Sequence, residues 1–249
     1  MNAFPKTQAQ GRYNKMSVEL AQNLAIAETI LRARTDFFNE IRDNIDLQPK
    51  IHAMFISSVI FMALYGAVIG SSLNILQALS SAIKLPLLFL LTSIICLPTL
   101  YFFNILFGAK QSLNQNLALI LTPITVTATL MFSFAPITLF FMLTTSDYQF
   151  FKLLNVAFYT IAGITGMWFL VQGMRIVSTT NEPGVRIRRW ALWLWIVAYA
   201  FVGSQMAWTL RPFIGYPGAK FEVVRQLGGN FYTNILASIG EILGFVILK

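Results

Sequence analysis

The sequence predicts an all-α fold, a polytopic membrane helix bundle with five to six spans and an N-terminal cytoplasmic amphipathic helix. Hydrophobic residues make up 56% of the 249 positions and charged residues only 11%, whereas a soluble domain carries roughly 25% charged residues. Thirteen of the 28 charged residues lie in the first 50 positions. The rest of the chain is too poor in charge to cover a soluble surface, and it contains uncharged runs of membrane-spanning length.

Residues 1–50 are predicted to form a cytoplasmic arm with a heptad-patterned helix over 16–46. Its seam residues recur at alternating steps of four and three, with one charged interruption, and they are Leu20, Leu24, Ala27, Leu31, Arg34, Phe38, Ile41 and Ile45. The segment from Asp46 to Pro49 is expected to end this helix.

Three interpretations of the arm compete. The helix rests on the membrane surface or packs on the protein's own spans, it forms a coiled-coil contact with a partner protein or a second copy of the chain, or it is merely solvated. Arg34 weakens a coiled-coil seam. Acidic residues on the arm argue against simple docking to anionic lipid, and they are Glu19, Glu28, Asp36, Glu40, Asp43 and Asp46.

Five uncharged runs predict the spans of a transmembrane domain over 51–249. A spanning helix needs about 20 predominantly apolar residues. The spans are therefore expected near 52–75, 85–107, 113–143, 151–174 and 190–210. The last of these is the clearest, because Trp190 and Trp208 lie near its ends, where the amphipathic indole prefers the headgroup region.

The third span contains Pro123 and Pro136. Proline removes a backbone donor and clashes with the preceding turn, so this helix is expected to kink or to split into two pieces. Membrane helices tolerate such prolines where neighbouring groups satisfy the freed carbonyls. The alternative is a broken helix that lines a substrate path, as in transporters.

A sixth span over 230–248 is possible from its apolar content, although it contains Glu241. Alternatively this helix lies along the membrane surface with Asn230, Asn234, Ser238 and Glu241 facing water. The composition favours the span.

The basic residues predict the orientation. With the N-terminus inside and six spans, 13 Lys and Arg residues fall on the inner side and five, among them Lys84, on the outer side. The positive-inside rule therefore predicts a cytoplasmic N-terminus. The net charge of +8 is explained by this distribution, so no nucleic-acid partner is expected.

The sequence contains no recognisable catalytic constellation, so we expect no enzyme, no cofactor and no metal site. The lone Cys96 lies in an apolar run, and the lone His52 lies at a membrane border without a second histidine. Spans one to five are expected to hold no ionisable group at membrane depth. Amides within the spans are expected to hydrogen-bond between helices, and they are Asn104, Asn155, Gln172 and Gln205.

The most specific segment is 205–232. Arg211 directly follows the fifth span, and the prolines and glycines after it predict a constrained loop that Phe213 and Tyr216 seat on the membrane face. In one interpretation this is a packed outer loop, with Arg211 reaching the headgroups or pairing with Asp147 or Glu222. In the other it is a recognition surface for a lipid headgroup or a partner.

The run WTLRPFIGYPG at 208–218, followed by GGNFY at 228–232, resembles the C-terminal region of a family of multi-pass bacterial membrane proteins frequent in cyanobacteria. The resemblance covers roughly residues 50–245, and the family is uncharacterised. It implies a location in a bacterial plasma or thylakoid membrane. A looser likeness to the Yip family of membrane-trafficking proteins lies in the polar arm, the five clustered spans and the LPLLF run at 85–89.

The function expected from the sequence is therefore non-enzymatic. The protein binds or organises partner proteins or lipids, using the arm on the inner side and the 211–229 loop on the outer side, with the lipid bilayer as its surroundings. The alternative is a small transporter or channel in which the kinked third span lines the path.

Overall fold

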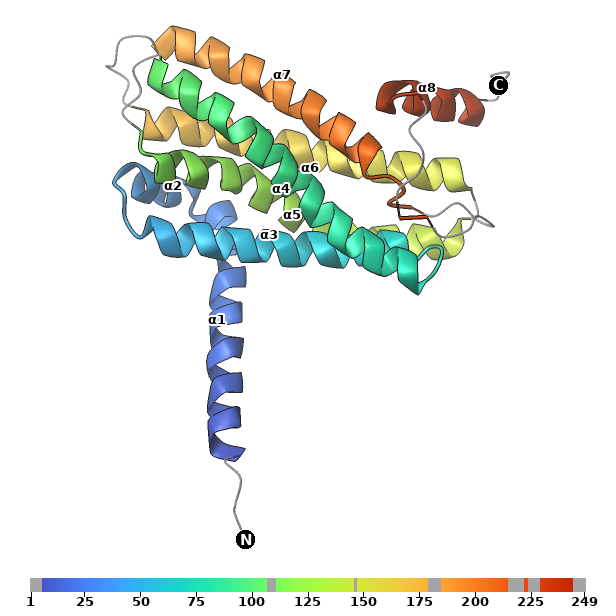
Figure 1. The fold of residues 1–249 in the computed structure, drawn as a ribbon, viewed down its shortest axis with the longest axis horizontal. Coiled ribbons are helices and arrows are strands. Elements are labelled where there is room, and N and C mark those ends of the chain that lie inside the picture. Colours follow the sequence, from blue (N-terminus) through green and yellow to red (C-terminus); the bar gives the residue numbers. More distant parts are fainter. Residues whose placement is uncertain are drawn as a thin grey trace.

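The computed structural model describes residues 6–106, 111–145, 147–178, 185–214, 222–223 and 229–243. These residues form eight α helices and no β strand, which confirms the predicted fold class (Figure 1). The helices are α1 (Lys6–Arg32), α2 (Arg34–Arg42), α3 (Leu47–Gly70), α4 (Ile75–Leu106), α5 (Leu113–Thr144), α6 (Tyr148–Val177), α7 (Val185–Thr209) and α8 (Phe231–Ile242).

The helices α3 to α7 form the bundle, and the described chain has five helices long and apolar enough to cross a membrane. The chain is therefore a multi-pass membrane protein. The turn between α3 and α4 and helix α8 mark one end of the bundle, on the right of Figure 1, which we term the outer end after the predicted orientation. Helix α2 marks the opposite, inner end.

The first two spans begin earlier than the charge pattern predicted. Helix α3 starts at Leu47 and α4 at Ile75, whereas the expected starts were 52 and 85. The prediction starts each span after a lysine, whereas Lys50 lies inside α3 and Lys84 inside α4.

Helix α5 lies at the centre of the bundle and packs on both α3 and α6. All its side chains from Ala118 to Ala128 are buried. It is one continuous helix across Pro123 and Pro136, so of the two expected outcomes, a kink or a split into two pieces, the split does not occur.

Helices α3 and α4 approach closely at their outer halves because α3 carries glycine at 66 and 70. A Cβ atom on Gly66 would lie 2.4 Å from the Ser81 carbonyl oxygen, and one on Gly70 would lie 2.5 Å from that of Gln77. The spacing is that of the small-residue motif by which membrane helices pack backbone against backbone.

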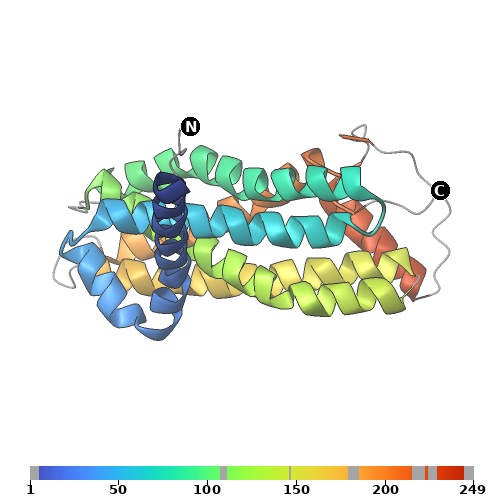
Figure 2. The same cartoon turned by 90° about the horizontal axis from the view of Figure 1, so that it is seen from below.

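The arm is two helices rather than the single predicted helix over 16–46. The break is at Ala33, whose φ of −113° and ψ of 41° are not helical. Helix α1 projects sideways across the direction of the spans (Figure 1) and appears end-on from below (Figure 2). Helix α3 then starts at Leu47, so the segment 46–49 begins the first span.

The break removes the continuous heptad seam, because a helix interruption changes the direction in which later residues point. Seam residues Phe38 and Ile41 are fully buried in the core, whereas Leu20 and Leu31 are 42% and 38% exposed. Leu24 is half-buried. Arg34 lies outside any seam, with its guanidinium 5.2 Å from the centre of the Trp168 ring.

The orientation can be tested with cysteines at described, exposed positions on opposite ends of the bundle. With Cys96 replaced by alanine, Arg186→Cys is expected to react with a membrane-impermeant maleimide only from the cytoplasmic side. Thr144→Cys is expected to react only from the outside. Labelling of both positions from one side would contradict the arrangement of the spans, and the reversed pattern would contradict the cytoplasmic N-terminus.

Candidate functional site

A stripe of three buried polar residues runs along the outer half of α4. Gln77, Ser81 and Lys84 are spaced by four and three positions, which places them on one face of the helix. Their exposed fractions are 0%, 0% and 6%. Buried polar groups are costly unless they are hydrogen-bonded, so the partners of this stripe identify what it holds. We term these three residues the α4 polar stripe.

The α4 polar stripe holds the backbone that follows α7. The amide of Gln77 donates to the Pro212 carbonyl at 2.9 Å, and the Ser81 hydroxyl donates to the Phe213 carbonyl at 2.6 Å. The Lys84 ammonium donates to the carbonyls of Pro212, at 3.2 Å, and Val223. Non-helical backbone within a membrane protein requires such internal partners. The stripe therefore docks the outer loop into the bundle.

Lys84 is the functional residue that sequence reasoning missed. It lies nine residues into α4, about 14 Å along the axis at roughly 1.5 Å per residue, and not in a connection between spans. Lys84 therefore lies within a helix long enough to cross a membrane, and not between two helices. The helical spacing of Gln77, Ser81 and Lys84 was a signal for one polar face, but the lysine was used to mark the end of a span.

Of the predicted interaction residues on the loop, Phe213 is seated in the bundle, where it packs on the cluster that contains Tyr65 and Met131. Arg211 stacks over Trp208, with the guanidinium carbon 3.5 Å from the ring centre. Tyr216 lies outside the described residues.

Asp147, one of the two predicted partners of Arg211, is the N-cap residue of α6. Its carboxylate caps the N-terminus of α6 by accepting hydrogen bonds from the amides of Gln149, at 2.8 Å, and Phe150, at 3.2 Å.

The stacking of Arg211 on Trp208 predicts that lysine is a poor replacement. A planar guanidinium covers an aromatic ring in a way that an ammonium does not. We expect Arg211→Lys to lower the thermal stability in detergent nearly as much as Arg211→Ala, by roughly 0.5–2 kcal/mol. Full stability of the lysine variant beside a destabilised alanine variant would contradict this, because charge alone would then suffice.

A buried hydroxyl and amide network lies within the same part of the bundle. The Tyr65 hydroxyl donates to the Asn155 side-chain oxygen at 2.6 Å and lies 3.2 Å from the Thr138 hydroxyl. Near the inner end, the side-chain amide nitrogen of Asn104 donates to the side-chain oxygen of Asn116 at 2.6 Å. The prediction that span amides bond between helices is confirmed for Asn104 and Asn155.

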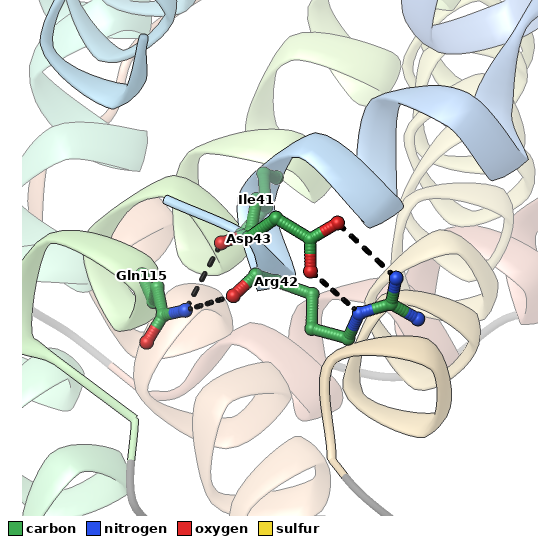
Figure 3. Close-up of polar contacts among 4 residues, drawn as sticks. All are labelled: Ile41, Arg42, Asp43 and Gln115. Carbon is green, nitrogen blue, oxygen red and sulfur yellow. Dashed lines mark hydrogen bonds and ion pairs between the residues drawn. The ribbon is translucent and has the colours of Figure 1, made fainter. Parts of the chain in front are cut away.

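At the inner end, Gln115 attaches the arm to the bundle (Figure 3). Its side-chain amide donates to the carbonyls of Ile41, at 3.0 Å, and Arg42, at 2.8 Å. These carbonyls belong to the last turn of α2, where backbone acceptors have no partner within the helix. Gln115 is itself fixed by a capping box with Ser112 at the start of α5.

Beside this attachment, Arg42 and Asp43 form an exposed ion pair, with Nε and Oδ1 2.9 Å apart (Figure 3). The hydrogen bond from the Arg42 guanidinium lowers the pKa of the Asp43 carboxyl below its ordinary value. Because the folded-state pKa is depressed, any stabilisation from this pair is present at neutral pH and is lost as the pH falls through that pKa.

In the part of the chain that the structure describes, no three His, Cys, Asp or Glu side chains lie together as a metal site would require.

Comparisons of the chain with protein-family models, with curated proteins and with solved structures find no match. The resemblances drawn from the WTLRPFIGYPG and LPLLF runs therefore remain predictions.

Proposed function

We propose that this membrane protein is non-enzymatic and binds or organises partner proteins or lipids in a bacterial membrane. The arm would be its contact on the cytoplasmic side, and the loop after α7 its contact on the outer side. The observation that carries the proposal is the placement of α1. This helix leaves the bundle sideways (Figure 1), and among its described side chains the buried ones lie near its C-terminal end.

The anchoring of α1 supports a role in contact. Ala27 and Ile30 are buried, at 5% and 0% exposed, and α1 packs on α3 and α5. Leu20, two turns before Ala27, and Leu31, directly after Ile30, remain exposed. Apolar side chains left uncovered beside a firmly fixed helix end are typical of surfaces that meet a lipid or protein partner.

The docking of the outer loop supports the second contact. The α4 polar stripe fixes the backbone of Pro212 and Phe213, and the Trp208 indole donates to the Gly229 carbonyl at 3.1 Å. The described backbone at Pro212, Phe213 and Gly229 is held in place by these bonds, and a preformed contact reduces the entropy lost on binding.

The alternative function, a small transporter or channel, requires α5 to line a path. The side chains around Pro123 are instead buried. The hydroxyls of Thr122 and Thr125 donate to the α5 backbone, at 2.8 and 2.9 Å. No observation on the described residues favours this alternative, and we do not propose it.

The proposal is tested by placing a photoreactive amino acid on α1 in native membranes. We expect positions 20 and 31 to crosslink strongly to protein, either a partner or a second copy of the chain. Ala25 is a matched control, because it is also exposed but lies on another face of the same helix. Equal crosslinking at all three positions, or crosslinking to lipid alone, would contradict a protein-binding role for the arm.

A further inference from the structure

Helix α8 carries a stripe of exposed apolar side chains. They recur at steps of four, three and four, which is one face of a helix, and they are Tyr232, Leu236, Ile239 and Leu243. Leu236 and Leu243 are 66% and 65% exposed. We term these residues the α8 apolar stripe.

Two polar residues of α8 bind the bundle. Asn234 accepts a hydrogen bond from the Lys152 ammonium at 3.1 Å, and Glu241 accepts one from the Gln149 amide at 2.7 Å. Ser238, between them on the same face, is 2% exposed. Of the residues that the surface alternative places toward water, Ser238 is instead buried and Asn234 half-buried, whereas Asn230 and Glu241 are exposed. Both donors belong to α6, so α8 is held by its polar face with the apolar stripe on the opposite side.

The start of α8 is also held by hydrogen bonds. Asn230 and Thr233 form a capping box, and the Tyr232 hydroxyl lies 3.0 Å from that of Ser204 on α7. Phe201, about one turn before Ser204, is 56% exposed. The apolar stripe thus continues directly onto the outward apolar surface of α7, a helix of membrane-spanning length.

The length of α8 limits what it can do. Its 12 residues span about 18 Å at roughly 1.5 Å per residue, against the roughly 30 Å of a bilayer's hydrocarbon core. The described part of α8 is therefore too short to cross, and residues 244–248 of the expected sixth span lie outside the described residues. Thr233 and Ala237 form another exposed sector of α8.

We propose that α8 is an interfacial helix embedded in the outer leaflet, with its apolar stripe against lipid and its polar face against α6. The occupant of the stripe is the lipid surface, because the stripe extends a surface that already faces acyl chains. A tyrosine in the stripe agrees with the headgroup level, where amphipathic rings are enriched. The sector of Thr233 and Ala237 faces water. This proposal is independent of the function proposed above.

The neighbouring residues Leu236 and Ala237 allow a sharp test, since they lie about 100° apart around the helix. Each would be replaced by cysteine in a Cys96→Ala background, labelled with an environment-sensitive fluorophore and reconstituted into phosphatidylcholine vesicles. We expect the label at 236 to be quenched severalfold more by doxyl-labelled phosphatidylcholine than by iodide, and the label at 237 to show the reverse. Labels at 243 and 233 should repeat the pattern, which guards against local disturbance by one label.

Three results would overturn the proposal. Iodide quenching at both positions would place α8 in water. Lipid quenching at both positions would place it within the hydrocarbon core, as a sixth span requires. Protection of position 236 from both quenchers, with spontaneous disulfide dimers of the Leu236→Cys variant, would show that a second copy covers the stripe.

Discussion

Gly66→Ala is expected to destabilise the bundle strongly. The new Cβ atom would lie 2.4 Å from the Ser81 carbonyl oxygen and 2.8 Å from its carbonyl carbon. Both are backbone atoms of α4, which cannot turn away as a side chain can. Helices α3 and α4 must therefore separate. Overpacking of this kind costs typically 1–3 kcal/mol.

The same displacement should loosen the outer loop. Ser81 is the residue against which the added methyl group would press, and its hydroxyl holds the Phe213 carbonyl at 2.6 Å. We therefore expect Gly66→Ala to lower the melting temperature in detergent and also to accelerate tryptic cleavage after Lys220 and Arg225. A variant that lost thermal stability but kept a protected loop would separate the helix contact from the loop contact.

Gly163 provides the matched control within α6. A Cβ atom there would meet nothing within 4 Å, and replacing a mid-helix glycine by alanine gains roughly 0.5–1 kcal/mol of helix propensity. Gly163→Ala is thus expected to melt at or slightly above the temperature of the native protein. The two variants are compared by the fraction of each protein that remains monodisperse after heating. Equal effects of the two substitutions would show that α3 and α4 are not in backbone contact at Gly66.

The helical class and the five spans could be predicted because both depend on composition and run length, which are local properties. The small-residue spacing of Gly66 and Gly70 is also visible in the sequence, although it does not identify the facing helix. The start of α4 was misplaced because a charge at Lys84 was treated as a boundary, and a buried charge is recognised only when its partners are known. These partners, the carbonyls of Pro212 and Val223, are more than 120 residues away in sequence.

The arm and α8 show a second limit. Spacing reveals which residues share a face, but not which face the protein covers. The residues from Leu20 to Ile45 follow a regular heptad spacing, but the helix break at Ala33 divides them between two helices. In α8 the spacing places polar residues on one face, but it does not show that Lys152 and Gln149 of a neighbouring helix bind two of them.

Lys84→Met is expected to release the outer loop while leaving the bundle folded. Methionine keeps a long unbranched side chain but has no hydrogen-bond donor, so the Val223 carbonyl loses the contact that Lys84 makes. The Pro212 carbonyl keeps the hydrogen bond from Gln77. The loss of a hydrogen bond to a charged group costs about 1.5–3 kcal/mol. We expect tryptic cleavage after Lys220 and Arg225 to accelerate roughly tenfold, since about 1.4 kcal/mol is a factor of ten in the open population.

The rate of loop cleavage is the measurement that decides this prediction. Removing a buried ammonium relieves a desolvation penalty while its hydrogen bonds are lost, so the two effects oppose each other in the overall free energy of unfolding. The melting temperature can therefore stay constant while the loop detaches. Ile83→Met is the matched control, because this neighbouring side chain on α4 is 63% exposed and should leave cleavage unchanged. If Lys84→Met is cleaved at the native rate, the loop is held by Gln77 and Ser81 alone, and the buried lysine does not dock it.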